Sequence, residues 1–343
     1  MVAKIMANTN QAIRYHEHGT PFNVLAIEDI TLRKLEPRQV RIEIQASTIH
    51  PSDLGLIQGS YGKLRMLPAV GGREGVGKVV EVGTDVKEEV MNKVVSIPDD
   101  VGAWQEYCTA EVDDLILLPA LVPYHQLAVS LLNPMTAWRL LNDFEYLREG
   151  DVIIQNAGNS GVGIAVVQFA KMIGVTCVSL VRNEDRARDL KSFGAKEVWL
   201  DNEDVPQRVR EFTEKKGCAM ALNSVGGRSA IRLAKCVGSG GVHVTFGAMD
   251  SQAVRFPTRN LIFDDIRFVG FWLDRWKRKK SPSQLRNSLE EVLQPLALNE
   301  VSYPIDSVFS MDDYKSAFKR NAESRFGKIL LARDKLAIEK SMS

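Results

Sequence analysis

Apolar positions in the first third of the chain follow a pattern typical of strands. Over residues 11–120, short runs that alternate or are rich in β-branched residues are separated by Gly and Pro. Examples are VRIEIQAS (40–47), GVGKVVEVG (75–83) and KVVSIP (93–98). Half-buried strands joined by turns give this pattern. This part of the chain therefore predicts an antiparallel, β-rich domain.

From about residue 151 the pattern changes to strands that alternate with helices. The apolar run VIIQNA precedes a glycine cluster and VGIAVVQFAKMIG, whose apolar residues recur at helical spacing. Further helices are predicted through RARDLKSFGA and near 206–216 and 228–236, between the strands VTCVSLV, EVWL, AMALNSV and GVHVTFGA. IRFVGFWL predicts one more strand. This alternation is typical of a doubly wound parallel sheet.

The end of the chain is expected to return to the first domain. Ser281, followed by Pro, predicts the start of a helix over 281–299, and strands follow that helix. We therefore expect a Rossmann domain at 129–275, inserted into a substrate domain made of 1–128 and 276–343. The ligand site is expected in the cleft between the two domains.

Length and charge narrow the class of protein. The 343 residues suggest two domains of about 150 residues each. The formal net charge of +1 provides no field that would gather nucleic acid. No run of about 18 apolar residues predicts a membrane helix. Residues 1–10 predict a poorly ordered arm without a secretory apolar core, and Lys4 is its one basic residue, so no transit peptide is evident.

Cysteine and histidine positions argue against a bound metal. Cys108, Cys177, Cys218 and Cys236 are scattered and form no C-x-x-C pair. They are expected to be small buried residues. His50 has no Cys or His partner at ligand spacing, so we interpret it as a loop or core histidine and expect no metal site.

A glycine cluster marks the expected nucleotide site. VIIQNA runs into GNSGVG (158–163), with spacing G-x-x-G-x-G, at the start of the predicted helix. Glycines there permit a tight turn and close approach to a pyrophosphate, and the helix N-terminus offers free N–H groups to the phosphates. The alternative is a purely structural turn. The repeated strand–helix context favours the dinucleotide site.

The residue after the next strand indicates which dinucleotide is bound. A site for NAD has an Asp or Glu there, which holds the ribose hydroxyls. Here VSLV is followed by Arg182, Asn183 and Glu184. A guanidinium at this position would bind a 2′-phosphate. Arg182 could also be a solvated loop charge, but the Rossmann context favours NADPH.

Without a metal, the hydride acceptor must need no Lewis acid. A carbon–carbon double bond conjugated to a carbonyl fits, because a weak acid can protonate its α-carbon after hydride addition. Tyrosine can serve as that acid and can also bind a developing oxyanion. The candidate is Tyr61 in QGSYG (58–62). From these residues alone, a surface loop tyrosine remains the stronger alternative.

Several stretches resemble a known enzyme family. GGREGVGKVVEVG and AGNSGVG resemble the zinc-free, quinone-reductase-like branch of the medium-chain dehydrogenase/reductase superfamily. HPSDLGLIQGSYG, LNPMTAWRLLNDFEYLREGDVIIQNAGNSGVG and LIFDDIRFVGFWLDRWKRKKSP resemble the mitochondrial trans-2-enoyl thioester reductases more specifically. The resemblance covers nearly the whole chain. It implies an α/β protein, with a Rossmann doubly wound parallel sheet and a β-rich GroES-like substrate domain.

The resemblance also implies an activity and its residues. Members of the family use NADPH to reduce trans-2-enoyl thioesters of acyl carrier protein or coenzyme A in fatty acid synthesis. The resemblance implies a homodimer in mitochondria, although a cytoplasmic location stays open. It makes Tyr61 the proton donor. It implies cofactor contacts at Asn133, Asn159, Ser160, Gly161, Val162, Arg182, Asn183, Glu184, Phe246, Gly247, Ala248, Met249, Phe271, Trp272, Leu273, Asp274 and Lys328.

Some residues and functions keep two interpretations. Asn133, before Pro134, is expected to cap a helix and to contact the cofactor as well. Trp272 and Trp276 could pack or could form a substrate wall. The basic run from Arg275 to Lys280 could be a solvated face or could meet an acidic carrier or coenzyme A phosphates. The rival functions are a quinone or general enone reductase, and a non-catalytic NADPH-binding protein of the crystallin type.

Overall fold

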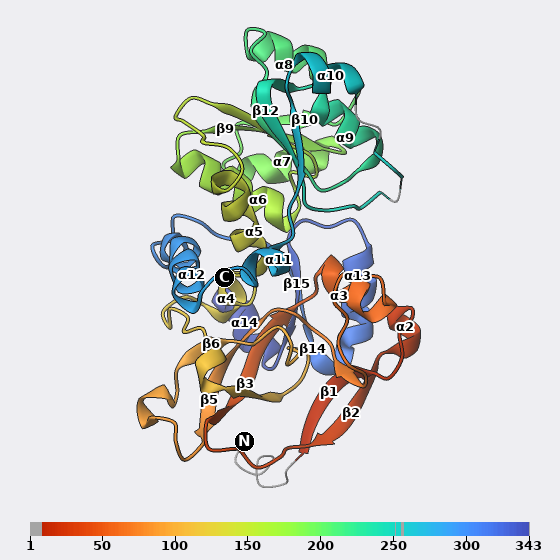
Figure 1. Ribbon diagram of the computed structural model, residues 1–343. Coiled ribbons are helices and arrows are strands. Elements are labelled where there is room, and N and C mark those ends of the chain that lie inside the picture. The colour runs from red at the N-terminus through yellow and green to blue at the C-terminus, as the bar shows by residue number, and fades with distance from the viewer. Residues whose placement is uncertain (1–8, 251, 255–256, 343) are drawn as a thin grey trace. The chain divides into compact units, whose positions relative to one another are not determined.

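The computed structural model describes residues 9–250, 252–254 and 257–342, and the chain divides into two compact units. One unit comprises Met1–Leu131 with Leu293–Ser343, and the other comprises Leu132–Val292. Most of the arm expected at the N-terminus lies outside the described residues, but Thr9 and Asn10 already belong to a strand. Figure 1 labels many of the elements of both units.

The second unit is built on a six-stranded sheet in which every strand pairing is parallel. Its strand order, β10-β9-β8-β11-β12-β13, is that of a Rossmann sheet, as the sequence predicts. The order reverses between β8 and β11, where such sheets bind their ligands. The strands are β8 (Val152–Gln155), β9 (Thr176–Val181), β10 (Glu197–Leu200), β11 (Cys218–Asn223), β12 (Val237–Thr245) and β13 (Arg267–Gly270).

Helices connect these strands, and all but the last of them lie near positions that the sequence predicts. Most residues of α6 are buried, and they include Ile164, Val167 and Phe169. The connecting helices are α6 (Gly161–Met172), α7 (Glu184–Ser192), α8 (Val205–Phe212), α9 (Gly227–Ala234) and α10 (Thr258–Phe263). Around them are α5 (Leu132–Asn142), α11 (Leu273–Lys277) and α12 (Pro282–Ala297).

The boundary after this unit lies later than the sequence analysis places it. We expected the second domain to end at 275, whereas the unit continues into α12 as far as Val292. Contacts with α5 explain the difference. Arg139 lies 5.4 Å from the ring centroid of Trp276, and both Arg139 and Trp138 donate hydrogen bonds to Glu291.

The first unit is β-rich and contains two sheets. In the larger sheet, β3 is the central strand, and it pairs antiparallel with β5, β7 and β15. The larger sheet contains β14 (Ile305–Ser310), β15 (Lys328–Ala332), β3 (Gln39–Thr48), β5 (Gly75–Val82), β6 (Val94–Ser96) and β7 (Tyr107–Glu111). The smaller contains β2 (Ala26–Thr31), β1 (Thr9–Tyr15) and β4 (Ala69–Val70). The pairing of β15 with β3 confirms that the C-terminal strands rejoin the first domain.

Within the described residues, five α-helices cover this β-rich unit. Two of them, α13 and α14, follow the last helix of the other unit in sequence and contact β14 and β15. The five are α2 (Pro21–Val24), α3 (Pro51–Gln58), α4 (Tyr124–Leu127), α13 (Tyr314–Ala322) and α14 (Lys335–Met342).

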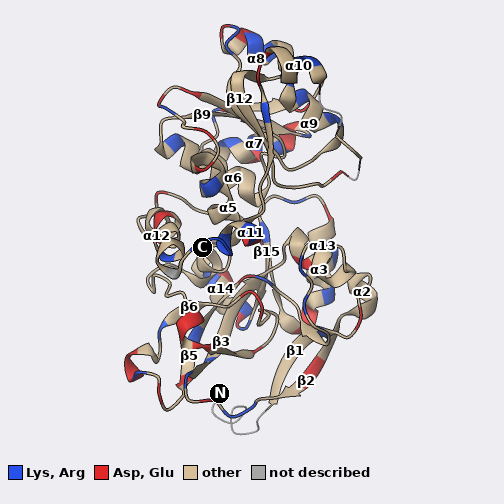
Figure 2. Cartoon of the chain, viewed as in Figure 1, with Lys and Arg blue, Asp and Glu red and all other residues tan. Residues whose placement is uncertain are grey.

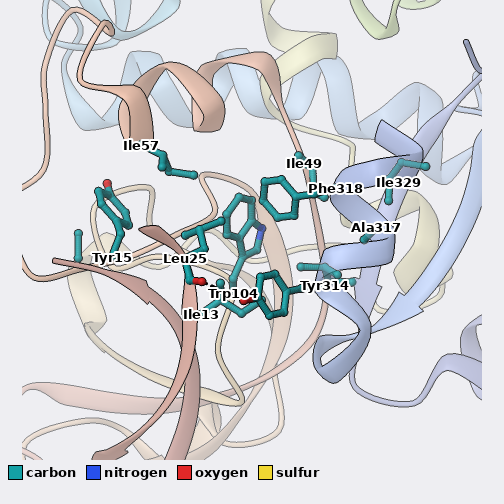
Figure 3. Packing of buried hydrophobic residues seen from close by; sticks show 12 residues of the cluster. Ile13, Tyr15, Leu25, Ile49, Ile57, Trp104, Tyr314, Ala317, Phe318 and Ile329 are labelled. Carbon is teal, nitrogen blue, oxygen red and sulfur yellow. Dashed lines mark hydrogen bonds between the residues drawn. The ribbon is translucent and has the colours of Figure 1, made fainter. Parts of the chain in front are cut away.

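The core of the β-rich unit is assembled around Trp104. Figure 3 shows its indole among side chains from segments far apart in sequence, including Leu25, Ile49 and Phe318. Its Nε1 donates a hydrogen bond to the Thr48 carbonyl at 3.1 Å. The ring of Phe318 meets it edge-on, with centroids 5.2 Å apart. This packing joins the two chain segments of the unit into one core.

Both units carry basic and acidic residues. Figure 2 shows Lys and Arg interspersed with Asp and Glu, in keeping with the net charge of +1. Within the described residues, no helix has the length and apolar character needed to cross a bilayer.

Candidate functional site

The glycine cluster forms a tight turn between β8 and α6. Ser160 caps the helix, and its Oγ accepts a hydrogen bond from the Gly163 N–H at 3.1 Å. A Cβ at Gly163 would lie 2.5 Å from the Gly158 carbonyl oxygen, and one at Gly158 would lie 2.7 Å from the Ser179 Cβ. These positions therefore need glycine. The turn leaves the first N–H groups of α6 available to an anion, which fits a pyrophosphate.

A buried polar network lies behind this turn, at the carboxyl ends of β8 and β11. Asn156 Nδ2 donates to Asn223 Oδ1 at 2.8 Å and to Ser229 Oγ at 3.0 Å. Asn156 Oδ1 accepts from the Ser224 N–H at 2.8 Å. Asn223 in turn donates to Thr245 on β12. The sequence analysis missed this network, although all of its residues except Ser229, which lies on α9, follow or end an apolar strand.

Arg182 lies directly after β9 and is exposed. The next residue, Asn183, caps α7 by accepting from the Arg186 N–H at 3.0 Å, and Glu184 begins that helix. The nearby carboxylate after β10, on Asp201, is already paired with Arg232 at 2.8 Å and with Ser229 at 2.6 Å. The end of β9 therefore presents a guanidinium, while the acid on the neighbouring strand is neutralised by its own partner.

The remaining candidates of this unit follow strand ends or lie on α5. Residues 246–249 follow β12, and a Cβ on Gly247 would lie 2.8 Å from the Ser224 carbonyl oxygen. Residues 271–274 follow β13, and the Phe271 N–H donates to the Thr245 carbonyl. The loops after β8, β9, β12 and β13 thus share the carboxyl edge of the sheet. Asn133 does not cap a helix as expected, since α5 begins at Leu132 and includes it.

Two tryptophans near the basic run pack against cations. The guanidinium of Arg278 lies 4.8 Å from the ring centroid of Trp272. Trp276 has Arg139 at 5.4 Å and the Lys280 ammonium at 5.1 Å. Part of the run is therefore held on aromatic faces, which favours the packing interpretation for these two rings.

Tyr61 in the β-rich unit is fixed by a turn and by an arginine. Gly59 caps the C-terminus of α3 in the left-handed conformation, with a φ of 77°. The Tyr61 N–H donates to the Gly55 carbonyl at 3.2 Å. Arg73 Nη1 donates to the Tyr61 hydroxyl oxygen at 2.8 Å, and its guanidinium carbon lies 5.0 Å from the ring centroid. The half-buried phenol is thus held in place from two directions.

Asp99 holds Arg73 in turn. Arg73 Nε donates to Asp99 Oδ1 at 3.0 Å, and Nη2 donates to the other carboxylate oxygen. The Arg73 side chain is only 5% exposed, so its charge needs this partner. The sequence analysis missed Arg73 and Asp99. A signal was present, because Arg73 and Glu74 together interrupt the small and apolar stretch that leads into β5.

Lys328 lies in a second buried cluster of the same unit. Its Nζ is 2.9 Å from His50 Nδ1, and His50 Nε2 is 2.5 Å from Glu74 Oε2. Because the ammonium donates to Nδ1, the ring proton must lie on Nε2, where it donates to Glu74. Burial lowers the pKa of His50, and burial also lowers the pKa of Lys328 to about 8. The amine that the resemblance assigns to the cofactor is therefore already bound to His50.

His50 and the cysteines occupy the buried positions expected for them. His50 precedes α3 and is 3% exposed, and its backbone N–H donates to Asp53 at 2.6 Å. All four cysteines are buried free thiols. Among the described residues, no three or more His, Cys, Asp or Glu side chains are grouped so that they could ligate a metal.

A cavity of about 150 Å³ in the β-rich unit lies away from these clusters. Its lining includes Gln45, Trp104, Glu106, Asp312 and Arg333. None of the predicted site residues lines it, so we assign it no part in the reaction.

Comparison with known proteins supports the fold of both units. Residues 36–120 match the family described as alcohol dehydrogenase GroES-like domain, and residues 161–294 match the family described as zinc-binding dehydrogenase. A mitochondrial 2-enoyl thioester reductase heterodimer from Candida tropicalis is similar over 94% of this chain and 99% of that chain, with 25% identity and a TM-score of 0.85. A mycobacterial quinone oxidoreductase is similar over the same shares, with 25% identity and a TM-score of 0.82. The α/β fold with a GroES-like domain is thereby confirmed.

Curated relatives distinguish between these two kinds of reductase. The chain is 36% identical over 315 residues to the mitochondrial enoyl-[acyl-carrier-protein] reductase of Homo sapiens, covering 90% of this chain and 84% of that protein. It is 35% identical over 329 residues to the protein of the same name from Caenorhabditis elegans, covering 94% of each. These similarities extend over both units. The chain belongs to the enoyl-[acyl-carrier-protein] reductase family.

Proposed function

We propose that this protein reduces trans-2-enoyl thioesters to saturated acyl thioesters with NADPH. The observation that carries the proposal is the Tyr61 hydroxyl, held by Arg73 on the turn after α3. This phenol can supply a proton to a reacting carbon without help from a metal. Membership of the enoyl-[acyl-carrier-protein] reductase family supports the same substrate class.

NADPH is the cofactor that the Rossmann unit fits. The turn at 158–163 and the free N–H groups of α6 would hold the pyrophosphate, and Arg182 would bind the 2′-phosphate. Asn133, the loops at 246–249 and 271–274, and Lys328 are further proposed contacts. A similar solved enoyl thioester reductase, with 25% identity and a TM-score of 0.84, contains NADP and crotonyl-CoA.

The proposed chemistry divides between the cofactor and Tyr61. NADPH, when bound, would supply the hydride that adds to the β-carbon of the enoyl thioester. Tyr61 hydrogen-bonds the thioester carbonyl and stabilises the enolate oxygen. Its hydroxyl then gives its proton to the α-carbon, and the phenolate left behind regains a proton from water.

The experiment that tests this function compares two substrates. Oxidation of NADPH should be followed with a crotonyl thioester and with a small quinone. Faster turnover of the thioester is expected. Preference for the quinone would indicate the rival quinone reductase, and no turnover of either would indicate a non-catalytic NADPH-binding protein.

Arg182→Ala should weaken NADPH binding while leaving NADH binding nearly unchanged. A charged hydrogen bond to a phosphate contributes about 1.5–3 kcal/mol, which is about a tenfold to hundredfold change in Kd. Fluorescence titration with each cofactor measures the two constants. Arg188→Ala is the matched control, since Arg188 is an exposed arginine on α7 that pairs with Asp185. An equal rise in the Kd of NADPH and of NADH would show that Arg182 does not bind the 2′-phosphate.

We also propose a homodimer formed through the sheet of the Rossmann unit. Strand β13 is the edge of that sheet, and Leu261, Ile262 and Phe263 on the preceding α10 are exposed. An open edge beside apolar side chains is a site at which another chain can pair. Light scattering at micromolar concentration should give the mass of two chains, and a monomer mass would contradict the proposal.

The carrier and the compartment are proposed from the relatives. Acyl carrier protein is the proposed thioester carrier, since the relatives' names include it. Those names also include the mitochondrion, which we propose as the compartment. Comparing KM for acyl carrier protein and coenzyme A thioesters would test the first point, and cell fractionation would test the second.

A further inference from the structure

The hydrogen bond from Arg73 to Tyr61 has a geometry that suggests a chemical effect as well as a structural one. Its Nη1 lies 2.8 Å from the phenolic oxygen, and its Nε and Nη2 are engaged by Asp99 on the other side. An arginine has no acceptor atom, so the Tyr61 oxygen must accept this hydrogen bond. The phenolic proton must therefore point away from Arg73.

We propose that Arg73 is a positioning residue that prepares Tyr61 to give up its proton, an inference that rests on the function proposed above. When the Tyr61 O–H bond breaks and its proton joins the α-carbon, negative charge develops on the phenolic oxygen. The Arg73 N–H already points at that atom, so the hydrogen bond strengthens as the charge forms. Such an interaction lowers the barrier because it is stronger in the transition state than before it.

Asp99 makes this arrangement stable. The Arg73 side chain is 5% exposed, and a buried guanidinium without a carboxylate would be costly. The side chain of Asp99 is 38% exposed and accepts hydrogen bonds from Nε and Nη2 of Arg73. Nη1 of Arg73 donates to Tyr61. The carboxylate fixes the rotation of the guanidinium plane, and the phenol receives a donor that needs no reorganisation during the reaction.

Arg65 provides a matched comparison. It is also a largely buried arginine that contacts Asp99, at 3.5 Å, but its other donors go to the backbone carbonyls of Val70 and Gly72. Arg65 therefore shares the structural surroundings of Arg73, but its donors are directed to Asp99 and to the backbone. Loss of Arg65 should affect stability and leave the chemistry of Tyr61 unchanged.

A double-mutant cycle tests the coupling. Arg73→Met should lower kcat with a crotonyl thioester by about tenfold to a hundredfold, the effect of one charged hydrogen bond. In the Tyr61→Phe background the same change should lower kcat less than about twofold, because the two residues act as a unit. Arg65→Met should change kcat by the same factor in the parent protein and in the Tyr61→Phe background. Equal effects of Arg73→Met in both backgrounds would overturn the proposal.

A second measurement gives the reactivity of the Tyr61 phenol without turnover or cofactor. An aryl sulfonyl fluoride reacts with a phenolate, and mass spectrometry of the Tyr61 peptide gives its labelling rate. Arg73→Met should slow labelling by about tenfold, since the charged hydrogen bond no longer favours the ionised phenol. Arg65→Met should label at the parent rate, and an unchanged rate in Arg73→Met would overturn the proposal.

The controls separate this inference from the proposed function. Parent protein that reduces no crotonyl thioester would contradict the function, whereas the labelling rates would still report whether Arg73 acts on Tyr61. If Arg73→Met does not fold, as judged by circular dichroism, Arg73→Lys keeps a cation beside Asp99. A single ammonium cannot reproduce the fork that spans Asp99 and Tyr61, so slower labelling is again expected and parent-like labelling would contradict the proposal.

Discussion

Tyr61→Phe is expected to reduce the rate with a crotonyl thioester by about 10²–10⁴-fold, the range typical of a positioned general acid. The substitution keeps the ring, so its contact with the Arg73 guanidinium at 5.0 Å can remain. It removes only the hydroxyl that accepts from Arg73. Steady-state kinetics with saturating NADPH gives the rate, and the Kd for NADPH should stay at the parent value.

Two controls limit the interpretation of that loss. Tyr146→Phe removes a hydroxyl from a tyrosine that is 81% exposed, and it should leave the rate unchanged. A small quinone can take its protons from water, so its rate of reduction should fall much less than that of the thioester. A Tyr61→Phe variant that reduces the thioester near the parent rate would mean that water or another group donates the proton.

Trp104→Ala is expected to destabilise the β-rich unit by about 3–5 kcal/mol, as large-to-small changes of buried aromatic residues do. The indole is 1% exposed and is surrounded by the side chains in Figure 3. Gly71 and Gly72 lie against its face, so closely that a Cβ on Gly71 would be 2.1 Å from the ring. The backbone there cannot collapse far into the space, and a cavity would remain.

Amide exchange is the suitable measurement for this variant, because the two units can unfold separately. Peptides from β3 and β15 should lose protection, whereas peptides from β8 and β11 in the other unit should keep it. Leu121→Ala is the control, since Leu121 is 100% exposed and its truncation creates no cavity. Unchanged protection of β3 in Trp104→Ala would show that the indole contributes little.

The Rossmann sheet was predictable because its signals are local. Each strand is a short apolar run, and each helix repeats its buried residues within one stretch, as α6 does with Ile164, Val167 and Phe169. The phosphate turn follows from glycines only a few residues apart. The start of α5 was predicted wrongly because Pro134 is compatible with several positions in a first helical turn, and only the structure shows that the helix begins at Leu132.

The surroundings of Tyr61 could not be predicted because they depend on distant segments. Asp99 reaches Arg73 across 26 positions, and Lys328 reaches His50 across 278. No periodic pattern encodes such contacts, since they arise only when strands of the larger sheet pair. The family resemblance identified Tyr61 itself, but the residues that hold it became visible only in three dimensions.

The pairing of β15 with β3 has a consequence for the order in which the protein can fold. Residues 46–48 on one edge of β3 pair with β15, and Thr48 Oγ1 donates to the Ile329 carbonyl at 2.9 Å. During synthesis, residues 132–292 leave the ribosome before β15 exists, so the nucleotide-binding unit can fold first. Until β15 arrives, that edge of β3 has unpaired N–H and C=O groups that can pair with other chains. The nascent β-rich unit therefore has an open strand edge that the finished protein closes with β15.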